Sequence, residues 1–138
     1  MEAEIRIIDQ LAEEGNRLFD EGKFKEAAEV YQHALAMIEE PHNASADAFW
    51  FQVSLGDAYF MEQQYEKAYR WLFEAKSNIG GDGYVNPFVM MRLGECARET
   101  GRHQEADEYL LRAYMLAGEE VFEEDDRKYL EGIRHLTG

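Results

Sequence analysis

A spaced pattern of small and large residues occurs three times along the chain. Each copy begins at a glycine, and further landmarks follow that glycine at offsets of 7, 9, 12, 16 and 19 residues. The three glycines are Gly15, Gly56 and Gly94. Fixed offsets of this kind indicate a fold made by stacking one supersecondary unit, since each unit alone cannot bury its apolar face.

Each copy has the periodicity of two consecutive amphipathic helices. In the first copy, apolar residues recur every 3.6 residues at Leu11, Leu18 and Phe19, and again between Phe24 and Ile38. We therefore predict a helical hairpin for each copy. The predicted turn holds Gly22 in the first copy and Gly101 in the third, where a left-handed residue ends the first helix. The second copy has Gln63 there, which must adopt that conformation or use another turn.

The glycine that opens each copy falls inside a predicted helix, where glycine costs about 1 kcal/mol relative to alanine. Close approach of the two helices of the hairpin would explain this recurrence. We expect each glycine to face a small residue of the second helix, and the matching residues are Ala27, Ala68 and Ala106.

The first copy, Gly15-Asn16-x-Leu18-Phe19-x-x-Gly22-x-Phe24-x-x-Ala27, resembles the tetratricopeptide repeat (TPR) family, in particular its small three-repeat members of bacterial type. The resemblance covers about residues 8–118. It is good in the second copy and weaker in the third. It implies an all-α fold, a right-handed superhelical solenoid of three helix-turn-helix hairpins. The copies lie 41 and 38 residues apart, more than the roughly 34 residues of the family unit, so the linkers around 41–45 and 80–87 are longer.

From this repeat we expect a single domain over residues 1–138, with hairpins at about 5–40, 46–79 and 87–118. A solenoid end needs a cap over its last apolar face. An amphipathic segment with Tyr129, Leu130 and Ile133 predicts a capping helix at about 126–137. Trp71 is expected in the core.

The charge of the chain narrows the classes of partner. The 29 acidic residues exceed the 14 basic ones and give a net charge of −15, which disfavours nucleic acid and membrane surfaces and favours a basic partner. Solubility, or adaptation to a salty cytoplasm, is the alternative explanation of this charge. The acidic start Met1–Glu4 and the lack of an apolar stretch of about 18 residues predict a cytoplasmic protein. Cys96 stands alone, so we expect a small buried residue rather than a disulfide.

The residue types that commonly act in catalysis are not arranged in any catalytic motif in this sequence. The serines lack a nucleophile-elbow context, the four histidines are scattered, and the acidic run lacks the spacing of a calcium loop. The glycine-rich linker at 80–87 lacks the Lys-Ser/Thr of a phosphate-binding loop. We therefore predict no enzymatic activity, no cofactor and no metal site.

The resemblance also implies a concave groove lined by the first helix of each hairpin. The groove residues that it implies are Asp9, Ala12, Asn16, Phe19, Asp20, Trp50, Val53, Asp57, Phe60, Met61, Phe88, Met91, Arg92, Glu95, Arg98 and Glu99. Aromatic and methionine side chains here are candidate contacts for a partner, although Trp50 and Phe88 could instead pack between hairpins. Family members that clamp chaperone C-termini use Lys, Asn, Asn, Lys and Arg at five positions, of which only Asn16 and Arg92 match here. The resemblance therefore argues against that role.

An acidic patch follows the third copy. It consists of Glu119, Glu120, Glu123, Glu124, Asp125 and Asp126. Three functions share the expected fold: a scaffold that binds a partner segment in the groove, an acidic immunity-type inhibitor of a basic toxin or nuclease, and self-assembly through the solenoid ends. The aromatic groove favours the first, the charge favours the second, and the predicted cap argues against the third. The oligomeric state is left open.

Overall fold

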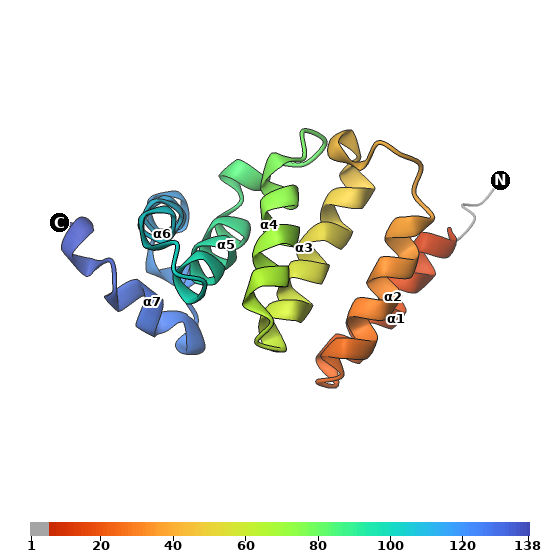
Figure 1. Ribbon diagram of the computed structural model, residues 1–138, viewed down its shortest axis with the longest axis horizontal. Coiled ribbons are helices and arrows are strands. Elements are labelled where there is room, and N and C mark those ends of the chain that lie inside the picture. Colours follow the sequence, from red (N-terminus) through yellow and green to blue (C-terminus); the bar gives the residue numbers. More distant parts are fainter. Residues whose placement is uncertain (1–5) are drawn as a thin grey trace.

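The computed structural model describes residues 6–138, so the acidic start Met1–Glu4 lies outside the described residues. Three helical hairpins follow one another along the long axis, with the first hairpin and the C-terminal segment at opposite ends of the row (Figure 1). Their helices are α1 (Ile7–Asp20), α2 (Phe24–Ala36), α3 (Ala46–Met61), α4 (Tyr65–Ser77), α5 (Pro87–Glu99) and α6 (His103–Ala117). The predicted all-α solenoid is confirmed. No helix between residues 6 and 138 has the length and apolarity to cross a bilayer.

The turn inside each hairpin uses a left-handed residue. Gly22 and Gly101 have φ of 79° and 80°, and Gln63 takes the same conformation with φ of 61°. The second hairpin therefore keeps the turn of the other two and carries the strain of a side chain at positive φ.

The glycine that opens each repeat faces a large residue, which corrects the expectation of a small partner. A Cβ on Gly15 would lie 2.5 Å from Cε1 of Tyr31, and one on Gly94 would lie 2.7 Å from Cγ of Leu110. Leu72 fills the same place opposite Gly56. Each glycine leaves room for the large side chain that follows it 16 residues later in the sequence. The alanine that follows each glycine 12 residues later is fully buried.

The long linkers are tied to each other by Asn78, which is 2% exposed. Its Nδ2 donates to the carbonyl oxygens of His42 and Ser45 and to Oε1 of Gln52, at 2.9–3.0 Å. Its Oδ1 accepts from the amide of Gly80 at 2.7 Å. One buried amide thus joins the linker after α2 to the linker after α4.

The third hairpin begins at a clear cap. The Asn86 side chain accepts a hydrogen bond from the amide of Val89, and Pro87 occupies the first turn of α5, as the sequence indicates. Cys96, further along the same helix, is fully buried as expected.

The C-terminal segment is more broken than the single helix predicted. A 3₁₀ turn at Glu124–Asp126 leads into α7 (Arg127–Glu131), and a second 3₁₀ turn follows at Arg134–Leu136. The segment still covers the last hairpin, because it buries Phe122, Leu130 and Ile133 in the core shared with hairpins two and three.

Candidate partner-binding groove

Two adjoining hollows lie along the side formed by the first helices. The smaller, of about 310 Å³, lies between α1 and α3, and the larger, of about 570 Å³, runs from α3 to the C-terminal segment. Phe19 and Asp57 line both, so we treat the two as one groove. Phe60, Met61 and Tyr65 give its floor an apolar character, and residues 123–126 form an acidic wall.

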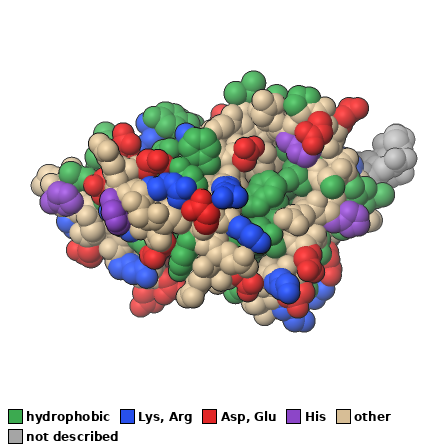
Figure 2. Space-filling model, viewed as in Figure 1, with side chains coloured by type: hydrophobic (Ala, Val, Ile, Leu, Met, Phe, Trp, Pro, Cys, Tyr) green, Lys and Arg blue, Asp and Glu red, His purple; other side chains and the backbone are tan. Residues whose placement is uncertain are grey.

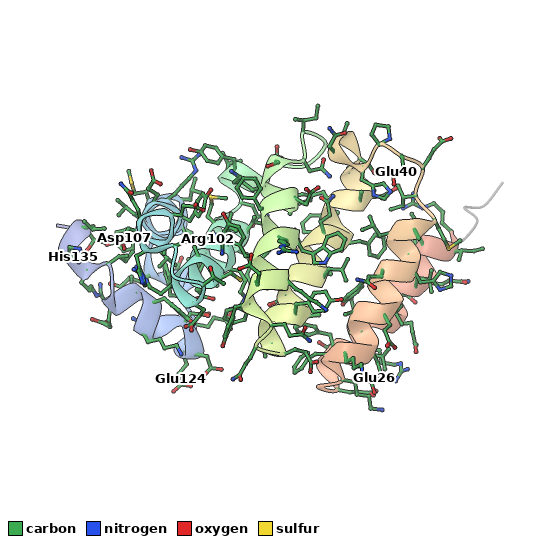
Figure 3. The ribbon with its side chains drawn as sticks, in the orientation of Figure 1. Glu26, Glu40, Arg102, Asp107, Glu124 and His135 are labelled. Atoms are coloured by element: carbon green, nitrogen blue, oxygen red, sulfur yellow. The ribbon has the colours of Figure 1, made fainter. Side chains whose placement is uncertain are left out.

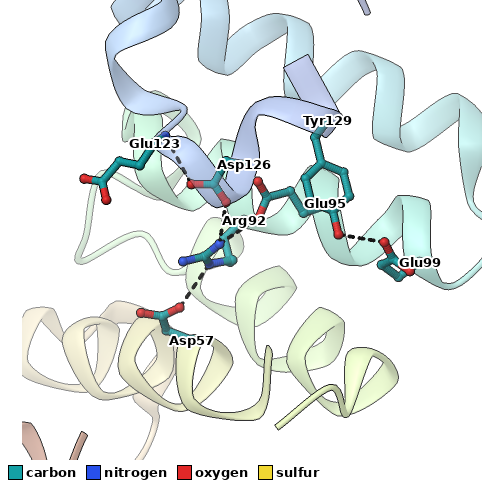
Figure 4. A network of polar contacts seen from close by, with 7 residues as sticks. All are labelled: Asp57, Arg92, Glu95, Glu99, Glu123, Asp126 and Tyr129. Carbon is teal, nitrogen blue, oxygen red and sulfur yellow. Dashed lines mark hydrogen bonds and ion pairs between the residues drawn. The ribbon is translucent and has the colours of Figure 1, made fainter. Parts of the chain in front are cut away.

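Arg92 closes the groove between α3, α5 and the C-terminal segment (Figure 4). Its Nε donates to Asp57 at 3.0 Å, and its Nη1 donates to Glu95 at 2.8 Å and to Asp126 at 3.0 Å. The guanidinium also lies 4.3 Å from the ring centroid of Phe60, within cation–π range. The Nε and Nη1 groups of this cation are therefore engaged within the protein.

The charges of this cluster do not balance. Arg92 faces three carboxyl groups, and the side chain of Glu95 is fully buried with Oε2 lacking any hydrogen-bond partner. Burial, together with the neighbouring Asp126, raises the pKa of Glu95 to about 9 in spite of Arg92. Burial also raises the pKa of Asp57, opposed by Arg92. Glu95 is therefore neutral at pH 7, and Arg92 is shared by Asp57 and Asp126.

Seven of the predicted groove residues line the two hollows. They are Asn16, Phe19, Asp20, Asp57, Phe60, Met61 and Arg92. Asn16 is held there by a hydrogen bond from the hydroxyl of Tyr31 at 2.6 Å, which joins α1 to α2.

Three predicted groove residues are buried, which corrects the expectation that they face a partner. Val53 is 8% exposed, Met91 is 1% exposed, and Glu95 is fully buried. Helix α3 is apolar on most of its circumference, and eight of its residues are buried, so its register alone did not separate groove positions from core positions.

The other predicted positions lie outside the hollows. Asp9 pairs with Arg6 at the exposed start of α1, and Ala12 packs against the first-hairpin core. Phe88 stacks on Arg92, and Arg98 pairs with Asp107 of α6 at 2.6 Å. Glu99 accepts from the hydroxyl of Tyr129 at 2.6 Å.

The two tryptophans differ from each other in exposure. Trp50 is 59% exposed and meets the ring of Phe49 edge-on, away from the groove. Trp71 is partly buried: it packs against the core cluster of the first two hairpins, as expected, and it also lines a different cleft.

The acidic patch divides in two. Glu119 forms ion pairs with Arg127 and Arg134, and Glu120 is exposed outside the hollows. Glu123, Glu124, Asp125 and Asp126 line the groove. Asp126 belongs to the Arg92 cluster, whereas the other three carboxylates form no ion pair with any residue between 6 and 138.

Six residues that line the groove were not predicted as groove residues from the sequence: Tyr31, Ser54, Gln63, Tyr65, Lys128 and Tyr129. Tyr65 is the landmark at offset 9, and it meets Phe60 across the turn with ring centroids 5.4 Å apart. Its place in the repeat could have revealed it. Lys128 and Tyr129 follow the last repeat, where no internal copy supplies a template.

The fold is shared with solved structures of low sequence identity. The Yersinia enterocolitica type III secretion chaperone SycD, in complex with a peptide of the translocator YopD, matches over 100% of both chains with a TM-score of 0.73 and 19% identity. The Sgt2 TPR domain of Aspergillus fumigatus matches 98% of this chain and 82% of its own, with a TM-score of 0.67 and 21% identity. No curated protein matches in sequence.

The tetratricopeptide repeat family model matches residues 89–120, which is the segment of the third hairpin. The match shows that this hairpin is similar to a tetratricopeptide repeat. The other two hairpins keep the same landmark offsets and the same left-handed turn.

Proposed function

We propose that this protein is a non-catalytic interaction scaffold whose groove binds a segment of a partner protein. The observation that carries the proposal is the composition of the larger hollow, where exposed Met61 lies beside Phe60 and Tyr65 under an acidic wall. Methionine and aromatic side chains supply adaptable contact area at binding surfaces. A hollow of about 570 Å³ holds several side chains of a bound segment.

The comparison with SycD supports a peptide as the ligand. SycD shares the fold over the full length of both chains, and its solved complex contains a peptide of the translocator YopD. A solenoid of this size therefore accommodates a peptide. Nothing in the comparisons favours the acidic-inhibitor hypothesis.

The wall of the groove suggests the chemistry of the bound segment. Glu123, Glu124 and Asp125 are exposed and without ion pairs among residues 6–138, while Arg92 is already neutralised. A segment with a Lys or Arg next to an apolar side chain would pair with this wall while it fills the floor.

Capture of the partner from native extract tests the groove. We expect Met61→Ala to reduce capture at least about fivefold, since about 1 kcal/mol at a contact gives that factor. Met115→Ala is the matched control, because Met115 is 76% exposed on α6, a second helix. Equal capture by both variants would contradict the proposed site.

A second pair of variants tests the charge of the partner. Glu124→Gln with Asp125→Asn should weaken binding at about 50 mM salt and have little effect at about 500 mM, where charges are screened within a few ångströms. Glu26→Gln with Glu108→Gln removes the same charge from α2 and α6; Figure 3 shows Glu26 and Glu124 on separate parts of the molecule. Equal loss in both pairs would leave only a general effect of net charge and would refute a specific acidic wall.

A further inference from the structure

A second hollow lies on the opposite side, between the second helices α2 and α4. It measures about 820 Å³ and has α3 at its base. Trp71, Leu35 and Pro41 give it apolar surface, and Lys67 and Arg70 border it on α4. Figure 2 shows hydrophobic side chains in a hollow beside basic ones on this face.

We call the space between two consecutive second helices a seam. In the next seam along the solenoid, between α4 and α6, side chains fill this space. There the hydroxyl of Tyr69 donates to Glu105 at 2.5 Å, and Nζ of Lys76 donates to the hydroxyl of Tyr109 at 3.3 Å. Arg102 of that seam also pairs with Glu66 at 3.0 Å. Aromatic rings and crossed charges fill the space between these two helices.

The repeat register places different residues at the matching positions of the α2–α4 seam. Ala28 corresponds to Tyr69, and Lys67 corresponds to Glu105. Gln32 corresponds to Phe73. Trp71 takes the position of Tyr109. No side-chain hydrogen bond or ion pair within residues 6–138 joins α2 to α4; Gln32 bonds instead to the hydroxyl of Tyr59 on α3. The seam therefore lacks an aromatic ring and a carboxylate that its neighbour contains.

The basic side chains of the α2–α4 seam, Lys67 and Arg70, form few ionic contacts within the described part of the chain. Lys67 forms no ion pair with residues 6–138 and lies 5.4 Å from the ring centroid of Tyr59. Arg70 is 75% exposed and approaches only Glu66, at 3.6 Å. At the other end of the hollow lie Glu40, labelled in Figure 3, and Glu74.

We propose that the α2–α4 hollow is a second binding site, which takes a partner segment bearing an aromatic side chain next to a carboxylate. The aromatic ring lies against Trp71, in the space that Tyr69 and Phe73 occupy in the next seam, and the carboxylate pairs with Lys67 and Arg70. This site is independent of the groove formed by the first helices.

N-acetyltyrosine, which has both a phenol ring and a carboxylate, is the probe of this site. We expect saturable shifts of the Trp71 indole N–H in nitrogen-labelled protein, with a Kd on the order of 1 mM for a ligand of this size. The indole N–H of Trp50, assigned with a Trp50→Phe variant, should not move. The neutral N-acetyltyrosinamide should bind at least about threefold more weakly, since it lacks the charge that pairs with Lys67.

Two variants make the result decisive. Gln32→Phe with Lys67→Glu installs the residues of the closed seam and should abolish the shift, while Lys67→Gln, a change at an exposed side chain, should weaken binding to the level of the amide. Absence of a saturable shift in the wild-type protein up to about 20 mM probe, twentyfold above the expected Kd, would overturn the proposal. An unchanged Kd in Lys67→Gln would overturn the carboxylate assignment, and an unchanged shift in the double variant would overturn the location.

Discussion

The burial and the protonation state of Glu95 depend on the residues around it and not on its position in the repeat. It lies on α5 at a position that the TPR resemblance assigns to the groove, yet it is fully buried beside Arg92 and Asp126. Burial raises its pKa to about 9, well above the ordinary value of a glutamate. Protonation removes one of three negative charges around one cation, so the cluster tolerates an acid inside the core.

This raised pKa makes stability depend on pH. A carboxyl group whose pKa is higher in the folded state stabilises the fold below its ordinary pKa of 4.5, and that contribution is lost as the pH rises toward 9. We expect the free energy of unfolding to fall by at least about 1 kcal/mol between pH 5 and pH 9, the equivalent of one pKa unit. Glu95→Gln should flatten this profile, as measured by urea unfolding. A variant with the same pH slope as the wild-type protein would contradict the assignment.

The backbone of Gln63 is strained, and the sequence indicates this because the other two copies have glycine at the matching position. Its φ of 61° matches the glycines of the other two turns, and a side chain in this region costs about 1 kcal/mol. Gln63→Gly should stabilise the protein by about that amount, less a small entropic loss. Gly101→Gln should destabilise it by a similar amount. The two changes are compared by thermal unfolding, and a lower melting temperature for Gln63→Gly would show that the turn is not strained.

At the scale of elements, the helices were predictable because the landmarks recur at fixed offsets. The linkers were not, since their contacts depend on residues far apart in sequence: Asn78 bonds to His42, Ser45 and Gln52. The broken C-terminal cap was also missed, because Tyr129, Leu130 and Ile133 keep a helical spacing although α7 ends at Glu131 after five residues. Periodicity identifies a helix more readily than its interruption.

Asn78 should therefore govern how the linker after α2 and the linker after α4 are held together. Asn78→Ala removes four hydrogen bonds at a buried site, and we expect a loss of about 2–4 kcal/mol at about 1 kcal/mol for each bond. Faster hydrogen exchange of the Gly80 and Ile79 amides should accompany it. Asn43→Ala, at an exposed residue of the same linker, is the control. Equal effects of both changes would refute the special role of Asn78.

For the whole molecule, the sequence predicted the solenoid and part of its groove. Phe19, Asp57, Phe60, Met61 and Arg92 line the larger hollow, and their role in binding a partner stays a prediction. The remaining positions depended on how the long linkers and the C-terminal segment set the hairpins against one another. A standard repeat geometry does not contain that information.

The net charge of −15 is also a property of the whole molecule. Most of the ion pairs are exposed and contribute little, so repulsion among the excess carboxylates should dominate the effect of salt. Raising NaCl from about 20 to about 300 mM should increase stability by roughly 1 kcal/mol, or a few degrees in melting temperature. A fall in melting temperature would mean that the ion pairs outweigh the repulsion.

The most direct test of the scaffold proposal is methyl NMR of methionine-labelled protein with the captured partner added. Met61 in the groove and Met115 on α6 are both exposed and lie on different helices, so they distinguish the two sides of the solenoid. The groove account predicts that the Met61 methyl signal shifts on binding and that the Met115 signal does not. A shift of Met115 with an unchanged Met61 would contradict it.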